Sequence, residues 1–296
     1  MKHFPMHLLC LSSLFALGLV SCGGGDSSSS TSGSEDFTID DSGDMLGNGT
    51  KENPYVPLNA DHWEELEPLI TGKEIRYVEL KKDLDLTSIR HYEPLGSKAA
   101  PVFAHINGNG HTIKYVIDET LKGDRYGLFA DFSGVAENLV VDGNIEATSG
   151  ERGGYCGIFA GEIETPKDYD NPVNTELRYL TVKGKIHMED NVSSNQDSVS
   201  AGGVTGHTYA TMGTTVLMDS IDSSVDLLIE TTNGCAGGLV GETWTNFNEG
   251  YTWFNNSYIH SSSIQAPNLA GGAVGYLYFN GSVVNTIVNV DLVEAT

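Results

Sequence analysis

One short phrase built around glycine recurs along this chain and constrains its fold more than any other feature. Its copies are Gly127-Leu128-Phe129-Ala130, Gly157-Ile158-Phe159-Ala160-Gly161, Gly203-Val204-Thr205-Gly206, Gly238-Leu239-Val240-Gly241 and Gly272-Ala273-Val274-Gly275. Their first glycines are separated by 30, 46, 35 and 34 residues. Recurrence every 20 to 50 residues, roughly, is typical of solenoids, propellers and arrays. The phrase therefore predicts a repeat architecture.

A second phrase recurs between the copies of the first. It aligns Asn138–Ala147 with Tyr179–Met188 and Ser257–Ala266, which places Leu139, Leu180 and Tyr258 in one register and Ile145, Ile186 and Ile264 in another. Apolar residues at two-residue spacing, separated by Gly, Asn, Asp and Ser, are strand and turn signals. Each unit therefore reads as two short strands joined by a variable loop, with no helix inside it.

A unit of two strands cannot bury its own apolar face, so successive units must stack, strand on strand, about 4.8 Å apart. We therefore expect an all-β fold, a parallel β-helix. The glycine that heads each phrase is expected to turn a corner, either because the backbone needs a positive φ or because a Cβ would block a close approach. An irregular antiparallel β-sandwich or a propeller is the alternative.

The first residues indicate export. Lys2 precedes an apolar run, Leu8–Val20, that is too short to span a membrane and suits a secretory signal. Its end, Leu19-Val20-Ser21-Cys22, resembles the bacterial lipobox, which implies a signal peptide over residues 1–21, cleavage before Cys22 and a membrane anchor through lipid on that cysteine. An ordinary signal peptide is the alternative.

Residues 22–53 are rich in Gly, Ser and Asp and have little apolar surface to bury, so we expect a disordered tether. Gly23 follows the lipid-bearing cysteine where lipoproteins kept in the inner membrane often carry Asp. The resemblance thus favours the outer membrane or the cell surface.

Charge and cysteine content narrow the class of protein. The chain has 16 basic and 40 acidic residues, and removing residues 1–21 removes only Lys2, which leaves 15 against 40 and a net charge of −25. Such a surface repels phosphate backbones, so nucleic acid is not expected as a partner. Cys156 and Cys235 lie near anchors two units apart, roughly 10 Å along a stack, too far for a disulfide. We expect two buried thiols.

Residues 54–72 are expected to cover the first unit. Asn59 can cap a helix over Asn59–Ile70, in which Trp63, Leu66 and Ile70 share one face. Pro68 predicts an early end or a kink. Since the open end of a solenoid needs a cover, Trp63 is predicted to be a core residue.

The stretch Phe103–Ile113 contains Asn107-Gly108-Asn109-Gly110-His111-Thr112-Ile113 and is followed by Gly127-Leu128-Phe129. With the later glycine phrases, this order resembles the GLUG-motif β-helix proteins of bacterial surface adhesins, which also occur beside IgA-protease-type metallopeptidases. The resemblance covers about residue 53 to the end of the chain. It implies a right-handed parallel β-helix over residues 73–296, displayed at the cell surface, and no shared catalytic residue.

No motif of a known catalytic or metal centre appears. The sequence lacks His-Glu-x-x-His, Gly-x-Ser-x-Gly and phosphate-binding glycine loops, and His105 and His111 flank a turn. Acids that could serve a polysaccharide lyase or hydrolase are Asp83, Asp85, Glu162, Asp168 and Asp170, but no unit shows acids and a base in matched positions. We expect no catalytic residue, no metal and no cofactor.

The insert after Gly241, Thr243–Tyr258, is rich in aromatic residues, and more follow one unit later. Exposed rings beside polar groups hold sugars, although rings also stack inside sheets. The candidate ligand-binding residues are Trp244, Phe247, Tyr251, Trp253, Phe254, Tyr276 and Tyr278.

The sequence predicts a surface-anchored, non-catalytic lipoprotein whose β-helix adheres to or binds an extracellular polymer, such as a glycan. The alternatives are a carbohydrate-active enzyme on the same scaffold and a purely structural spacer. The last residues, Asp291–Thr296, still read as strand, so we expect self-association or a protein partner at an uncapped last unit, unless the sequence is incomplete.

Overall fold

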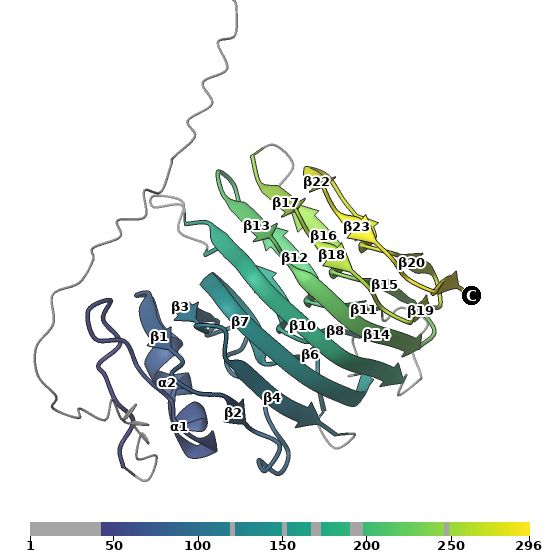
Figure 1. The fold of residues 1–296 in the computed structure, drawn as a ribbon. Coiled ribbons are helices and arrows are strands. Elements are labelled where there is room, and N and C mark those ends of the chain that lie inside the picture. Colours follow the sequence, from purple (N-terminus) through teal and green to yellow (C-terminus); the bar gives the residue numbers. More distant parts are fainter. Residues whose placement is uncertain (1–42, 119–121, 150–152, 167–172, 190–197, 246–248) are drawn as a thin grey trace, which may run out of the picture. The chain divides into compact units, whose positions relative to one another are not determined.

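The computed structural model describes residues 43–118, 122–149, 153–166, 173–189, 198–245 and 249–296. Within these ranges the strands pair in parallel and form a 19-stranded and a 5-stranded sheet, with two short helices at the N-terminal end (Figure 1). The signal peptide, Cys22, Phe247, Asp168 and Asp170 lie outside the described residues.

The strands form stacks that run along the solenoid. The 5-stranded sheet stacks β6 (Arg125–Tyr126), β8 (Gly154–Gly157), β11 (Val199–Gly202), β15 (Gly234–Gly237) and β20 (Leu269–Gly271). In the larger sheet, one stack follows the glycine corner: the start of β7 (Phe129–Ser149), then β9 (Ala160–Glu164), β12 (Thr205–Ala210), β16 (Val240–Thr245) and β21 (Val274–Leu277).

The rest of the larger sheet continues each turn. One stack holds β1 (Arg76–Glu79), β3 (Val102–Asn107), the middle of β7, the start of β10 (Thr175–Glu189), β13 (Thr215–Asp219), β17 (Tyr251–Asn255) and β22 (Gly281–Val284). The next holds β2 (Leu84–Asp85), β4 (Thr112–Ile117), β5 (Lys122–Gly123), the ends of β7 and β10, β14 (Asp222–Glu230), β18 (Tyr258–Ile259), β19 (Ser263–Ala266), β23 (Ile287–Val288) and β24 (Leu292–Ala295). Each turn of the chain thus lies on the one before it, and the predicted parallel β-helix is confirmed.

The glycine phrases are the corners between the two sheets. The residue after each leading glycine hydrogen-bonds to the next corner: the Leu128 amide donates to the Ile158 carbonyl and the Leu239 amide to the Ala273 carbonyl. None of the leading glycines has a positive φ. A Cβ on Gly203, however, would lie 2.3 Å from the carbonyl oxygen of Gly238. Of the two reasons that the sequence allowed, close approach between turns is therefore the one that requires glycine.

The register of the second phrase is confirmed in most positions and wrong in one. Leu139 pairs with Leu180, and the column of Ile145 and Ile186 continues through Leu227 to Ile264, all buried. Tyr258 instead pairs with Asp222 and is exposed. The chain holds one more residue between Tyr258 and Ile264 than between their partners Asp222 and Leu227. A turn accommodates this residue, and in it the Ser262 and Ser263 amides both donate to Asp226 Oδ1. That local turn shifts the earlier strand by one position.

A second corner stacks residues in the left-handed conformation. Asn138, Tyr179, Ser220, Asn256 and Asn285 occupy equivalent places in successive turns, with φ of 52°, 52°, 58°, 51° and 49°. Asn adopts this conformation more readily than most residues. The Asn256 side chain also links two turns here by donating to Asp219 Oδ1 at 2.7 Å. Tyr179 is the bulky exception.

The N-terminal helices cover the first turn, as predicted. Asn59 accepts a hydrogen bond from the His62 amide at the start of α1 (Ala60–Glu65). Pro68 lies in the first turn of α2 (Glu67–Ile70), so the helical segment is divided into two short helices. Trp63 is fully buried against Phe129 and donates to the Tyr92 hydroxyl at 3.1 Å. Among the described residues, no helix is long and apolar enough to cross a membrane.

Both remaining cysteines are free and buried, which confirms that prediction. Cys156 pairs with Ala201 and Ala201 with Ala236, so the position of Cys235 lies two turns away and one residue out of line with Cys156. Burial raises the pKa of the Cys235 thiol to about 12 and that of Cys156 further. Both thiols are packing groups.

Candidate functional sites: an aromatic face, a charged ladder and a histidine–carboxylate cluster

The predicted aromatic residues divide into two groups. On β16 the side chains of Thr243 and Thr245 are buried, and on β17 those of Thr252 and Phe254 are buried, so the two strands turn these sides toward the interior. Trp244 on β16 therefore points away from Trp253 on β17. The predicted aromatic residues that are exposed therefore lie on different outer sides of the solenoid.

Trp244, Tyr276 and Tyr278 form what we call the aromatic face. The Trp244 ring lies 5.4 Å from that of Tyr278, which stacks at 5.8 Å and 24° on Tyr276. Trp244 is 46% exposed and Tyr276 39%. Tyr209 on β12 pairs with Trp244 and extends the row toward the N-terminal turns. The face is thus an exposed row of rings across adjacent strands.

The other predicted aromatic residues lie elsewhere. Tyr251 and Trp253 are exposed on β17, with no described ring of the aromatic face in contact. Phe254 is fully buried, so its prediction as a ligand-binding residue is wrong. The alternation of the strand explains this, because the residue after an outward-facing Trp253 must face the core.

Beside the aromatic face runs a row of charged side chains that we call the charged ladder: Arg125, Asp131, Glu162, His207 and Glu242. Asp131, Glu162, His207 and Glu242 are register partners on β7, β9, β12 and β16, and Glu242 pairs next with Tyr276. Arg125 comes from β6 in the smaller sheet. The ladder therefore lies where outward-facing side chains of the two sheets meet.

The ladder's contacts are close. The Arg125 guanidinium reaches Glu162 Oε2 at 2.6 Å and Asp131 Oδ2 at 2.9 Å, and His207 Nδ1 lies 3.0 Å from Glu162 Oε1. The His207 ring stacks on Tyr155 at 4.6 Å. Arg125 thus pairs with carboxylates of two neighbouring turns, and His207 contacts Glu162 from the turn that follows it.

The two inner carboxylates have opposite pKa shifts. Burial raises the pKa of Asp131 to about 7: attraction to Arg125 lowers the pKa, but burial together with repulsion from Glu162 and Glu164 outweighs it. Asp131 forms an ion pair with Arg125, but neither of its oxygens accepts a hydrogen bond of good geometry. Burial also acts on Glu162, but its hydrogen bond and attraction to His207, with Arg125, hold its pKa at about 2. Glu162 is ionised whereas Asp131 holds its charge poorly.

The charged ladder was not predicted from the sequence, because acids and bases in matched positions were sought within a single unit. The ladder instead takes one charged group from each of several turns. Of the other acids expected for an enzyme, Asp83 accepts the Thr112 amide at 2.9 Å, and Asp85 accepts the amide and hydroxyl of Thr87. Both serve as turn acceptors.

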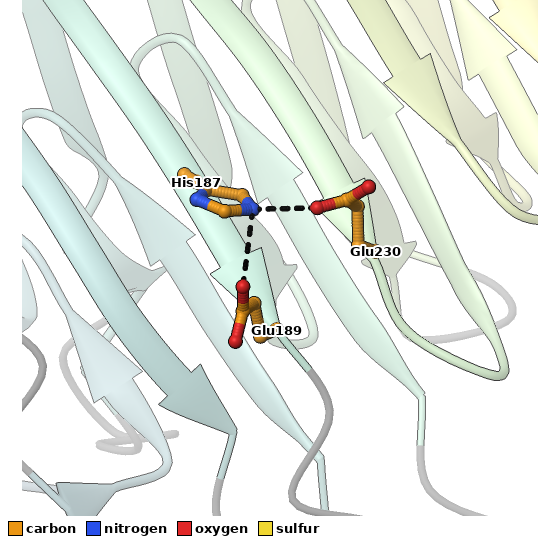
Figure 2. Close-up of side chains that lie close together, drawn as sticks. All are labelled: His187, Glu189 and Glu230. Carbon is orange, nitrogen blue, oxygen red and sulfur yellow. Dashed lines mark hydrogen bonds and ion pairs between the residues drawn. The ribbon is translucent and has the colours of Figure 1, made fainter.

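A third group lies on the stack formed by the ends of β7 and β10 and by β14. We call it the histidine–carboxylate cluster, and its members are Glu146, His187, Glu189 and Glu230. His187 and Glu189 lie on β10, Glu146 on β7 and Glu230 on β14. The His187 ring points between Glu189 and Glu230, with Nε2 2.8 Å from Glu230 Oε2 and 3.8 Å from Glu189 Oε1 (Figure 2). Burial lowers the pKa of His187, but hydrogen bonds to Glu230 and Glu146 outweigh it and raise the pKa.

The two histidines of the turn signature have structural partners. His105 Nε2 lies 2.9 Å from Glu137 and His111 Nδ1 3.2 Å from Asp83. Each contact joins neighbouring turns, in agreement with a role in the turns.

Comparison with known proteins bears on the fold. No model of a known protein family matches the chain. A protein from Evansella cellulosilytica, provisionally named a Gly-rich membrane protein, is 32% identical over 111 residues, which is 35% of this chain and 13% of that protein. The chain thus corresponds to a small part of that relative's length.

The crystal structure of a protein from Bacteroides ovatus, provisionally named an immunoglobulin A1 protease, is similar to this chain with a TM-score of 0.56 at 20% identity. The similarity covers 83% of this chain and 79% of the other. At this identity the likeness establishes the all-β solenoid fold alone.

Proposed function

We propose that this protein is a surface-anchored, non-catalytic lipoprotein whose β-helix binds an extracellular polymer through the aromatic face. The observation that carries the proposal is the row of exposed Trp244, exposed Tyr276 and half-buried Tyr278 beside the carboxylate of Glu242. Stacked rings next to hydrogen-bonding groups recognise sugars, because the apolar face of a sugar packs on a ring while its hydroxyls bond to polar neighbours. The ligand class is a glycan of the cell surface or matrix.

The proposed location is the bacterial outer membrane or cell surface. The lipobox-like sequence ending at Cys22 would supply a lipid anchor. The membrane-protein name of the Evansella relative supports a location at a membrane, and the likeness to the Bacteroides protein fits the resemblance to GLUG-motif surface proteins.

A carbohydrate-active enzyme is the second candidate, favoured by one observation. Asp131 and Glu162 have pKa values shifted in opposite directions, as paired carboxyl groups of glycosidases do. Against it, Asp131 is fully buried and Glu162 is 6% exposed. A polymer could not reach either group without displacing the ladder.

Binding of residues 37–296 to an array of immobilised glycans tests the proposal. We expect Trp244→Ala with Tyr276→Ala to weaken binding at least tenfold, because each ring would lose a stacking contact of about 1 kcal/mol or more. Tyr251→Ala with Trp253→Ala is the matched control, since it removes two rings of similar exposure from β17. The control should bind as the wild type does.

The alternatives give other results. Release of soluble products, abolished by Glu162→Gln, would establish the enzyme instead. Absence of binding to any glycan would leave a structural spacer, and equal losses in both double variants would remove the aromatic face from the proposal.

A further inference from the structure

The histidine–carboxylate cluster has no place in the proposed polymer site. His187 pairs in register with Glu146 of the preceding turn, and Glu189 pairs with Glu230 of the following one. The four side chains therefore come from three neighbouring strands of one stack. Figure 2 shows the imidazole of His187 directed at both Glu189 and Glu230.

The ligand atoms have the spacing of a metal site. One ring nitrogen of His187 and one carboxylate oxygen each of Glu189 and Glu230 lie within 4.8 Å of one another. Two ligands bound tetrahedrally to zinc at about 2.1 Å are about 3.4 Å apart. The distances from Nε2, 2.8 Å to Glu230 and 3.8 Å to Glu189, lie on either side of that value. Small rotations of exposed glutamate side chains would equalise them.

Glu146 orients the ring. Its carboxylate bonds to His187 Nδ1 on the side away from the other two glutamates. With Nδ1–H donating to Glu146, the lone pair of Nε2 is directed at the gap between Glu189 and Glu230. Metal-binding histidines commonly donate their second nitrogen to a carboxylate in this way, which fixes the tautomer and makes the ligand more basic.

The cluster also lacks a compensating cation. Within the described ranges, the ion pairs of Glu146, Glu189 and Glu230 are with His187 only. Elsewhere on the same stack a lysine neutralises the acid of the adjacent turn, as Lys183 does for Asp142 at 3.3 Å. Three carboxylates around one imidazole carry a net negative charge whether or not the ring is protonated, and a divalent cation would offset it.

We propose that His187, Glu189 and Glu230 bind one Zn²⁺ ion that joins two adjacent turns of the solenoid, with Glu146 as the positioning residue. A ligand set of one imidazole and carboxylates suits Zn²⁺ better than Ca²⁺, because Ca²⁺ takes about six to eight oxygen ligands. Water would complete the coordination, because both glutamates are exposed. The ion would hold β10 to β14 at their C-terminal ends.

Titration of the full chain with ZnCl₂, followed by calorimetry and by the melting temperature, tests this proposal. We expect one Zn²⁺ per chain at micromolar concentration, a raised melting temperature and its reversal by EDTA. His187→Gln and Glu230→Gln should each weaken binding at least tenfold. Glu146→Ala should weaken it about tenfold, because it removes the acceptor that holds the ring. Calcium at the same concentration should have no comparable effect.

His260→Gln is the matched control, because His260 is an exposed histidine 2.7 Å from a single carboxylate, Asp222. It should leave Zn²⁺ affinity unchanged. Circular dichroism of each variant separates loss of a ligand from loss of the fold. Wild-type protein that binds no Zn²⁺, or folded His187→Gln that binds it as tightly as the wild type, would overturn the proposal.

Discussion

Asp131 is the most deeply buried carboxylate in the described part of the chain. Its pKa is raised from 3.8 to about 7, so the folded state holds its proton more tightly than the unfolded state does. The stability that this proton contributes is complete below the unfolded pKa and is lost as the pH rises through about 7. Glu162 has the opposite sign, and its contribution is lost only as the pH falls from 4.5 toward about 2.

Asp131→Asn should therefore make the free energy of unfolding less dependent on pH. As the pH rises from about 4 to 7, the free energy of unfolding of the wild type should fall by up to roughly 1 kcal/mol per pH unit relative to the variant. Urea unfolding at several pH values measures this difference. Asp142→Asn, at a partly exposed acid paired with Lys183, is the control. Parallel stability curves for wild type and Asp131→Asn would contradict the assigned shift.

At the scale of the element, the corner between the sheets depends on the absence of side chains. A Cβ on Gly203 would meet the Gly238 oxygen at 2.3 Å and the Ser223 hydroxyl at 2.4 Å, whereas a Cβ on Gly72 would meet nothing within 4 Å. Gly203→Ala should destabilise the protein by about 1–3 kcal/mol, because backbone of one turn must move away from the next. Gly72→Ala should change stability little.

Thermal or urea unfolding of the two alanine variants checks this expectation. If Gly203→Ala were as stable as Gly72→Ala, the corners would have to be more compliant than their close contacts indicate.

The same scale explains what the sequence could predict. The glycine phrases and the Leu139 and Ile145 columns are local patterns, and they predicted the stacking and the corners. The helix that covers the first turn was predicted from another local pattern, the Asn59 cap and the shared face of Trp63, Leu66 and Ile70. The charged ladder depends on pairing turns of unequal length, 30 to 46 residues apart, and no local pattern gives that register. For the histidine–carboxylate cluster, the sequence did contain one signal. The aligned second phrases place Glu146 opposite His187, as the structure does.

The burial of Tyr258 and Phe254 could not be predicted from the sequence pattern. One additional residue before Ile264 moved Tyr258 out of the core, and alternation placed Phe254 inside it. Composition alone marked both as members of an aromatic insert. Sorting them requires knowing which side of each strand faces inward.

At the scale of the whole molecule, the two ends of the solenoid differ. The first turn lies under α1 and α2, whereas strands β21 to β24 of the last turn pair on one side only (Figure 1). Val283 stacks on buried Phe254 and Val293 on buried Ile264, yet both are about two-fifths exposed, at 41% and 42%. Inward-facing positions are thus open to solvent at this end.

The stacking of equivalent positions also bears on how long such a molecule can be. The Gly154 amide donates to the Ser198 carbonyl, and the Val199 amide donates to the Asn233 carbonyl, so residues 199–233 make one full circuit and return the chain to an equivalent point. Nothing in the cross-section sets the number of circuits. The length of this protein, unlike its width, is therefore a quantity that can change by whole turns while every remaining turn keeps the neighbours it needs.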